Sequence, residues 1–289
     1  MIKSQEFFNE NKRKKITPRL VYPPRKKLGQ NFLWNENYLR KIVAACPLES
    51  STIVIEIGSG YGNLTNWLAK TNCQKIISLE KDERLFKWLT SQQLLKNDKV
   101  LFLHQDALKI NWLTWVEKWK GNPLVAVGNL PYSIANSLII GLLMSRLFKN
   151  FIFLVQQEVA QRWVASPLKY VKHYSVLSVF INYLAQTEII FTVPANVFIP
   201  TPPVNGALVK IKPYQTVNLS LKDLQSFLSF LKKCFNFRRK TLLNNLNKFK
   251  NRKEWGEYFK RKNYALSIRP QNLTPTEYWE LFIFSQELS

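Results

Sequence analysis

Cysteine and histidine are scarce in this sequence. Its 289 residues include 3 cysteines and 2 histidines. Cys46, Cys73 and Cys234 stand far apart and form no CxxC pair, and only His104 and His173 could join them as metal ligands. This pattern argues against a disulfide framework and against a zinc site. We therefore expect reduced, structural cysteines and no metal.

Long apolar runs are also missing. The best candidate for a membrane span, LIIGLLMSRLF at residues 138–148, is interrupted by Arg146 and falls short of the roughly 20 residues that a span requires. The N-terminal stretch MIKSQEFFNENKRKK has no apolar segment typical of a signal peptide, and its Glu6 and Glu10 are unusual for a transit peptide. We expect a cytoplasmic protein with no membrane partner.

Acidic residues are outnumbered by basic ones. There are 42 Lys and Arg against 19 Asp and Glu, which gives a net charge of +23 and a pI near 9.9. Each cation set against a phosphate releases a condensed counterion, so this charge favours a polyanionic partner, with nucleic acid as the leading candidate. An anionic membrane surface would also attract it, and an AT-rich genome raises Lys and Asn content without any binding role.

What the sequence does contain is an alternation of short β-rich runs with helical patterns. Residues 1–25 are polar and basic and are typical of an N-terminal arm, which either follows a phosphate backbone or is a solvated tail without a role. Within residues 26–214, strand and helix patterns alternate, which predicts a parallel sheet covered on both faces. After the linker-like PYQTVN, residues 215–289 have the spacing of a small helical domain.

Two longer β-rich stretches follow the alternating part. They are YSVLSVFINYLAQTEIIFTV at residues 174–193 and ALVKIKP at residues 207–213, with no obvious helix between them. We therefore expect the sheet to finish with antiparallel strands.

The stretch IEIGSGYGNLT carries the first candidate site. It follows strand-forming residues and opens a helix. Gly58, Gly60 and Gly62 lack Cβ atoms, so the backbone can turn tightly and leave room for a ligand. No Lys-Ser/Thr pair follows, which argues against a P-loop, and a dinucleotide site would prefer G-x-G-x-x-G.

Two acidic residues end the next two predicted strands. Glu80 stands where a carboxylate can accept hydrogen bonds from ribose hydroxyls, and Asp106 stands where it can accept one from an adenine amino group. Open α/β sheets bind ligands outside the carboxyl ends of their strands, so the pair predicts a nucleoside-binding crevice.

The run GNLPYSIANS ends the fourth predicted strand. The side-chain oxygen of Asn129 and the carbonyl of Leu130, held extended by Pro131, form two neighbouring acceptors that suit an exocyclic NH2. Tyr132 adds a face for stacking a planar base. The run therefore predicts a pocket for an aromatic amine.

With these residues in place, the chain resembles the S-adenosyl-L-methionine-dependent rRNA adenine N6-dimethyltransferases, specifically the small-subunit (16S-type) branch. The resemblance runs from about residue 26 to residue 278, through motifs in the family's order: KKLGQNFL, EIGSGYGNLT, SLEKD, HQDAL, GNLPY, FIPTPPV and FNFRRKT. It implies a Rossmann-like class I methyltransferase sheet over residues 26–214 and an all-helical, RNA-binding C-terminal domain over residues 215–289.

The resemblance also implies a reaction and a partner. Two adjacent adenosines in a hairpin near the 3′ end of small-subunit rRNA would each receive two methyl groups, in a step of ribosome biogenesis. The expected partner is small-subunit rRNA or the immature small ribosomal subunit, with no DNA, and the expected state is a monomer.

Site roles are carried over in the same way. Residues implied to contact or border the cofactor are Asn31, Leu33, Glu56, Gly58, Gly60, Glu80, Asp106, Ala107 and Asn129. The target adenine would be flipped onto Asn129, Leu130 and Tyr132, and Phe198 would cover its other side.

Two alternatives remain open at this point. Leu130 in NLPY and the FNFRRKT motif favour the small-subunit branch over the large-subunit resistance methylases. A ribosome assembly factor with secondary or no methylation is the second alternative. The sequence departs from the usual small-subunit pattern at Gln157, Ser175, Asn205 and Gly206, all expected away from the cofactor rim.

Two further features of the sequence bear on function. His104 lies close to Asp106 in sequence, but a structural role is favoured over that of a general base. A cluster of cations is predicted to grip rRNA phosphates, with a solvated helix face as the alternative: Lys232, Lys233, Arg238, Arg239 and Lys240.

Overall fold

A seven-stranded sheet forms the centre of the molecule in the computed structural model, which describes residues 20–92, 97–216, 219–246 and 252–287. The strands run in the spatial order β4-β3-β2-β5-β6-β9-β7. Their bounds are β2 Ile53–Ile57, β3 Lys75–Glu80, β4 Val100–His104, β5 Leu124–Asn129, β6 Phe148–Gln156, β7 Ala185–Val193 and β9 Gly206–Pro213.

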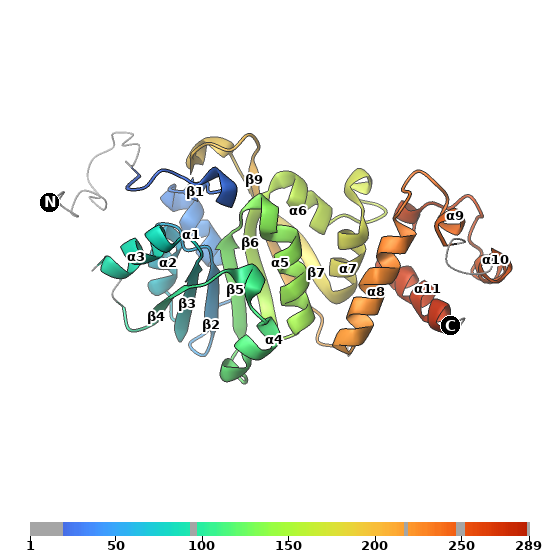
Figure 1. The fold of residues 1–289 in the computed structure, drawn as a ribbon, viewed down its shortest axis with the longest axis horizontal. Helices are drawn as coiled ribbons and strands as arrows, with labels where there is room; N and C mark the ends of the chain where they lie inside the picture. The colour runs from blue at the N-terminus through green and yellow to red at the C-terminus, as the bar shows by residue number, and fades with distance from the viewer. Residues whose placement is uncertain (1–19, 93–96, 217–218, 247–251, 288–289) are drawn as a thin grey trace.

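The first five strands of this order are parallel, as the alternating pattern predicts. The chain moves outward from β2 through β3 to β4, then returns to the other side of β2 and continues through β5 to β6 (Figure 1). Ligand sites in open sheets form at this kind of reversal, because the connections leave β2 and β5 in opposite directions. The predicted antiparallel finish is confirmed, since β9 pairs antiparallel with both β6 and β7.

Helices cover both faces of the sheet (Figure 1). Their bounds in the main domain are α1 Glu36–Ala45, α2 Asn63–Ala69, α3 Glu83–Ser91, α4 Trp112–Trp115, α5 Tyr132–Ser145, α6 Gln157–Trp163 and α7 Val176–Leu184. One core joins the sheet to α1 and α2, and a larger one joins its other face to α4, α5, α6 and α7. Ile53 and Ile55 belong to the larger core and Val54 between them to the smaller, as expected for a strand buried on both faces.

The expectation that residues 174–193 are wholly β is wrong for their first half. Val176–Leu184 form α7, and the strand β7 starts only at Ala185. Val179 and Ile181, two of the three β-branched residues of α7, are buried, so packing against α5, α6 and α8 outweighs their weaker helix propensity. A capping box also starts this helix, because the backbone N–H of Ser175 donates to the hydroxyl of Ser178 at 3.0 Å.

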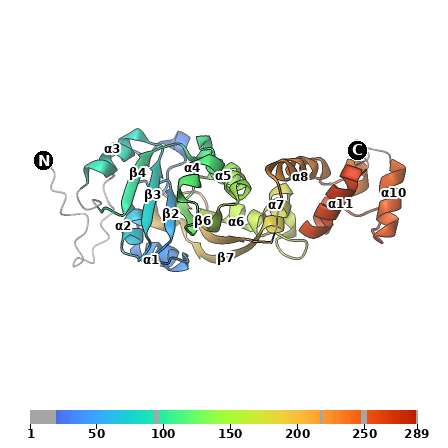
Figure 2. The same cartoon turned by 90° about the horizontal axis from the view of Figure 1, so that it is seen from below.

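The C-terminal part is helical, as predicted. It contains α8 Leu221–Cys234, α9 Leu242–Leu246, α10 Arg252–Arg261 and α11 Pro275–Glu287. Figure 2 shows these helices at the end of the molecule opposite α3. They share a continuous apolar core with α7, where the rings of Tyr183 and Trp279 stack at 4.9 Å. The Tyr174 hydroxyl adds a bond across this boundary by donating to the Leu273 carbonyl at 2.8 Å.

A second, two-stranded sheet lies beside the first. In it, β1 Phe32–Leu33 pairs antiparallel with β8 Phe198–Ile199, which brings together two motifs far apart in the sequence. Residues 1–19 of the proposed N-terminal arm lie outside the described residues. The described end of that arm contacts the main domain, where the backbone N–H of Tyr22 donates to the Tyr61 hydroxyl at 3.0 Å.

Within the described residues, no helix is both long and apolar enough to cross a membrane.

We expect Gly128→Ala to destabilise the protein. A Cβ at this position in β5 would lie 2.4 Å from the carbonyl oxygen of Ile57 in β2, so the two central strands would have to separate. The expected loss is about 2 kcal/mol or more in the free energy of unfolding, measured by urea denaturation. In contrast, Gly256→Ala in α10 meets nothing within 4 Å, and it should stabilise the protein by roughly 0.5–1 kcal/mol. Equal urea midpoints for Gly128→Ala and Gly256→Ala would contradict the expected clash at Gly128.

Candidate active site

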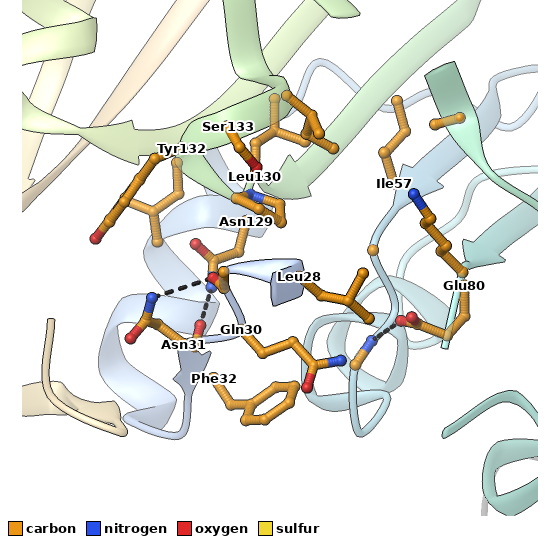
Figure 3. Close-up of a pocket in the computed structure, with 18 of the residues that line it drawn as sticks. Leu28, Gln30, Asn31, Phe32, Ile57, Glu80, Asn129, Leu130, Tyr132 and Ser133 are labelled. Atoms are coloured by element: carbon orange, nitrogen blue, oxygen red, sulfur yellow. Dashed lines mark hydrogen bonds between the residues drawn. The ribbon is translucent and has the colours of Figure 1, made fainter. Parts of the chain in front are cut away.

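A cavity of about 220 Å³ opens at the carboxyl ends of the parallel strands. Its walls come from β2, β3, β5 and β6, from the turn after β4, and from the segment 27–32, which crosses in front of them (Figure 3). The location is the one expected for an open sheet that reverses between β2 and β5.

Ten of the twelve predicted site residues line this one cavity. They are Asn31, Gly58, Gly60, Glu80, Asp106, Ala107, Asn129, Leu130, Tyr132 and Phe198. Leu33 and Glu56 lie outside the lining. The side chain of Leu33 is 5% exposed and belongs to the core under α1 and α2, while its carbonyl accepts a hydrogen bond from Asn63 Nδ2 at 2.9 Å.

The glycine-rich turn forms one wall. Gly58 and Gly60 have φ angles of 81° and 58°, in the left-handed region where a Cβ is unfavourable. A Cβ on Gly60 would also lie 3.0 Å from the ring of Phe32, so glycine here lets the segment 27–32 approach the turn. The Gly60 N–H points at Glu80 and donates to its Oε2 at 2.8 Å.

Glu80 is held in place from two sides. Its Oε1 accepts the backbone N–H of Asp82 at 2.7 Å, and its Oε2 accepts that of Gly60. Burial raises the pKa of this carboxyl above its ordinary value, and the two backbone donors oppose that shift. Each carboxylate oxygen has a second lone pair, so the group can still accept hydrogen bonds from a ligand.

Asp106 lines the cavity beside a cation. Lys81 Nζ approaches its Oδ2 at 2.9 Å, and the Leu108 N–H donates to its Oδ1 at 3.1 Å. Partial burial raises the pKa of Asp106, but these two donors outweigh that effect and hold it below its ordinary value. The carboxylate is therefore an ionised acceptor at neutral pH.

The Asn129 side chain is fixed by a backbone carbonyl. Its Nδ2 donates to the backbone carbonyl oxygen of Asn31 at 2.8 Å (Figure 3). A carbonyl partner can face only the amide nitrogen, so this contact assigns the oxygen of Asn129 to the other side of the amide. Next to it, the Leu130 N–H donates to the Leu154 carbonyl at 2.9 Å, which anchors the Asn-Leu-Pro turn to β6.

Aromatic side chains border the same end of the cavity. Tyr132 opens α5 and is half-buried, and burial raises the pKa of its phenol. Phe198 is 4% exposed, and its place opposite Leu33 in the β1–β8 pair sets it at the cavity edge. The two rings therefore come from elements far apart in the sequence, α5 and β8.

Gly206 corrects one expectation. The four departures from the small-subunit pattern were expected to lie away from the site, but Gly206 lines the cavity. A Cβ there would lie 3.1 Å from Leu154 Cδ1 and 3.3 Å from Phe198 Cζ, so a larger residue would press on both side chains. Of the other three, Asn205 accepts the Ala195 N–H through its side-chain oxygen at 3.0 Å and the Gln157 N–H through its carbonyl at 3.0 Å.

Sequence reasoning missed several lining residues, of which Gln30 is the most connected. Its Nε2 donates to Asp82 Oδ2 at 3.1 Å, and its Oε1 accepts the Arg25 N–H at 2.8 Å. Asp82 also contacts the Arg84 guanidinium at 2.7 Å. Burial raises the pKa of Asp82, but the hydrogen bonds from Arg84 and Gln30 lower it by more. The pKa therefore lies below its ordinary value, and Asp82 is a carboxylate paired with a cation. Gln30 stands in the KKLGQNFL motif, which is the only signal that could have found it.

Glu56 lies behind the cavity in a hydroxyl network. Its Oε2 accepts hydrogen bonds from Thr65 Oγ1 at 2.6 Å and from Ser78 Oγ at 2.5 Å, and Ser78 contacts Ser59 Oγ of the glycine turn at 2.6 Å. The Oε1 atom is buried without a partner. Burial raises the pKa of Glu56 to about 7, against the lowering effect of the two hydroxyls.

His104 makes structural contacts. Its ring stacks on Phe86 at 5.5 Å, and its Nε2 lies 3.2 Å from the Lys81 carbonyl. In the part of the chain that the structure describes, no three His, Cys, Asp or Glu residues gather as a metal site would require. The three cysteines are buried free thiols.

The predicted cation cluster lies on the surface, in the last turn of α8 and in the turn that follows it. Lys232, Lys233, Arg238, Arg239 and Lys240 are all exposed. Arg238 also reaches the main domain, where its Nη2 donates to the Val171 carbonyl at 2.8 Å.

The chain matches a family model described as ribosomal RNA adenine dimethylase over residues 23–284. It is 38% identical to a ribosomal RNA small subunit methyltransferase A from Caldanaerobacter subterraneus over 77% of this chain and 82% of that one. A protein of the same description from Levilactobacillus brevis is 37% identical, with 93% of this chain and 92% of that one covered.

Solved structures give the same fold at lower identity. A dimethyladenosine transferase from Plasmodium falciparum superposes with a TM-score of 0.70 at 24% identity, covering 88% of this chain and 97% of that one. The 23S rRNA methyltransferase ErmE superposes with a TM-score of 0.67 at 22% identity, covering 88% and 99%. These likenesses confirm the Rossmann-like methyltransferase sheet with a helical C-terminal part.

We expect Glu56→Gln to flatten the dependence of stability on pH. Between the ordinary value of 4.5 and about 7, the folded protein keeps a proton that the unfolded chain releases, so stability falls as the pH rises through this window. The amide cannot ionise, so the variant should lose this fall, which amounts to at most about 3 kcal/mol. Urea denaturation from pH 4 to pH 8 measures it, with the exposed Glu49→Gln as control for the loss of one carboxylate. A Glu56→Gln slope equal to that of the unsubstituted protein would contradict the assignment.

Proposed function

From the premise that the chain belongs to the ribosomal RNA adenine dimethylase family, we propose that it dimethylates N6 of two adjacent adenosines in a hairpin near the 3′ end of small-subunit rRNA. The observation that carries the proposal is the Asn129 amide, held by the Asn31 carbonyl with its oxygen on the opposite side and Tyr132 and Phe198 beside it. An acceptor next to aromatic rings suits a flipped adenine.

The methyl donor of this enzyme is S-adenosyl-L-methionine. The lining residues fit it: Glu80 presents a buried carboxylate to ribose hydroxyls, Asp106 an ionised acceptor to an adenine amino group, and Gly60 a turn without a Cβ. When bound, the donor supplies a methyl group on a sulfonium sulfur, which is electrophilic. A Cβ at position 58 would lie 3.8 Å from the backbone carbonyl oxygen of Asn129. Because Gly58 has none, the space between the donor and the target base would stay open.

Positioning and polarisation are the work left to the protein. The lone pair of an adenine amine is delocalised into the ring, so the amine is a poor nucleophile. The Asn129 oxygen and the Leu130 carbonyl would accept its two N–H groups and return electron density to nitrogen. The proton leaves to water after transfer, so no general base is required, which agrees with the structural contacts of His104.

The small subunit is the favoured substrate over the large one. The relatives at 32–38% identity are described as small subunit methyltransferases, whereas the 23S rRNA enzyme ErmE shares the fold at 22% identity. The net charge of +23 and the exposed cations after α8 support a polyanionic substrate. We further propose that the enzyme acts in the cytoplasm as a monomer and does not use DNA.

We expect Asn129→Ala to abolish most methyl transfer. Loss of one preorganised acceptor at the reacting group should lower kcat roughly 100- to 1,000-fold, with a smaller effect on the KM for S-adenosyl-L-methionine. The measurement is transfer of labelled methyl to unmethylated small ribosomal subunits, with large subunits and DNA in parallel and nucleoside analysis of the product. Asn122→Ala, at the other end of β5, is the matched control and should retain activity.

The outcomes separate the alternatives. Dimethyladenosine from the small subunit alone supports the proposal. Label in large subunits would indicate the resistance branch, and tight subunit binding without any label would indicate an assembly factor.

Glu80→Gln should weaken binding of S-adenosyl-L-methionine about tenfold or more. A hydrogen bond to a carboxylate contributes more than one to a neutral amide, and the amide has only one acceptor to share among Gly60, Asp82 and the ribose. Isothermal titration calorimetry gives the Kd. Glu83→Gln, on the exposed side of α3, removes the same charge as a control and should leave the Kd unchanged. Equal affinities for the two variants would remove Glu80 from the cofactor site.

A further inference from the structure

A ridge beside the main domain combines exposed apolar side chains with cations. We define it as the loop between α6 and α7, residues 166–173, together with the turn after α8, residues 236–240. Leu168 at the tip of the loop is 97% exposed, Val171 39% and Phe237 43%. Lys169, Lys172, Arg238, Arg239 and Lys240 are exposed around them. Neither segment contains an acidic residue.

The loop is rigidly built, so its leucine does not fold back onto the protein. Ser166 and Lys169 exchange backbone hydrogen bonds of 2.8 and 3.2 Å, which close a tight turn around Leu168. Asn182 Nδ2 of α7 donates to the Trp163 carbonyl at the end of α6 at 2.8 Å, which joins the two helices that flank the loop.

Two further features hold the far side of the loop. The Arg238 guanidinium donates to the Val171 carbonyl at 2.8 Å, so the two segments of the ridge are joined directly. Tyr170 has a φ of 54°, a left-handed conformation that costs energy for a residue with a side chain. A turn that is strained, held by hydrogen bonds and tipped by an exposed leucine indicates a surface that contacts another molecule.

The ridge lies near the cavity. Val155 lines the cavity at the end of β6, and the seven-residue helix α6 that follows is only about 10 Å long. The loop after α6 projects from the same edge of the main domain as the segment joining η2 Lys26–Leu28 to β1 (Figure 1). An RNA with one base in the cavity would carry its neighbouring nucleotides along this edge, toward the ridge.

We propose that Leu168 is an apolar wedge that packs against rRNA bases flanking the target adenosines, while Lys169, Lys172 and Arg239 neutralise the adjacent phosphates. Apolar side chains inserted between bases unstack them, and surrounding cations offset the phosphate charge. The wedge rests on the proposed function, because it supplies the unstacking that lets an adenine leave its stack and enter the cavity.

The test uses the full chain with Leu168→Asn, which keeps the size of the side chain and removes its apolar surface. We expect kcat/KM on unmethylated small subunits to fall about tenfold, because a buried leucine contributes this much to a contact. Base-specific chemical probing of the rRNA in the complex should show nucleotides beside the target reactive with the unsubstituted protein and protected with the variant. Leu113→Asn in α4, 39% exposed, is the matched control and should match the unsubstituted protein in both.

Binding at several salt concentrations tests the cations separately. Lys172→Ala should lower the slope of log K against log salt by about 0.7–0.9, the value for one phosphate contact.

Each result decides between separate ideas. If the unsubstituted protein does not methylate adenosine, the proposed function fails and not the wedge alone. If it methylates and Leu168→Asn is equally active, the wedge is overturned. If the variant loses activity while the probing pattern stays unchanged, Leu168 contacts a ribosomal protein instead, which also overturns the wedge.

Discussion

The close approach of β2 and β5 at Gly128 is the constraint on which the site depends. The carbonyl of Ile57 occupies the space of a Cβ at Gly128, just beyond the last paired residues of the two central strands, Glu56 with Val127. Beyond their ends, the chain continues into turns that border the crevice, at the point where the strand order of the sheet reverses. Gly58 follows one strand and Asn129 ends the other, which places the glycine turn and the target acceptor on one shared wall. On the proposed function, the methyl group would have only a short path from the donor beside the glycine turn to a base beside Asn129.

The segment 27–32 makes this wall a closed site. Through the Asn31 carbonyl it fixes the Asn129 amide, and through Gln30 it is tied to Asp82 after β3. Gly29 fits against Pro131, since a Cβ there would lie 3.3 Å from the proline ring. Segment 27–32 thus contacts both the turn after β3 and the end of β5. On the proposed function, this contact would hold the acceptor in one orientation, which favours electrostatic catalysis.

Sequence patterns predicted the parts of this structure that depend on local chemistry. The parallel strands were predictable because their apolar runs are buried on both faces, and Glu80 and Asp106 because strand ends meet at one edge of a sheet. Helix α7 was not, since its β-branched residues are held by tertiary packing. The position of Gly206 was not either, because its contact with Phe198 depends on the pairing of β1 with β8. The pairing of strands that lie far apart in the sequence cannot be predicted from local sequence patterns.

Charge is divided between the interior and exterior of this site. The cavity walls present acceptors, since Glu80 and Asp106 are carboxylates and Asn129 faces its partner carbonyl with nitrogen. These groups favour neutral donors such as ribose hydroxyls and adenine amines, and they repel phosphates. The chain carries a net charge of +23 and, outside the cavity, an exposed cluster of cations at the end of α8, which attract phosphates. On the proposed function, an RNA strand would be held outside by its backbone, and a base turned out of its stack would be complementary to the interior. The same division explains why a polyanion-binding protein carries two carboxylates at its centre.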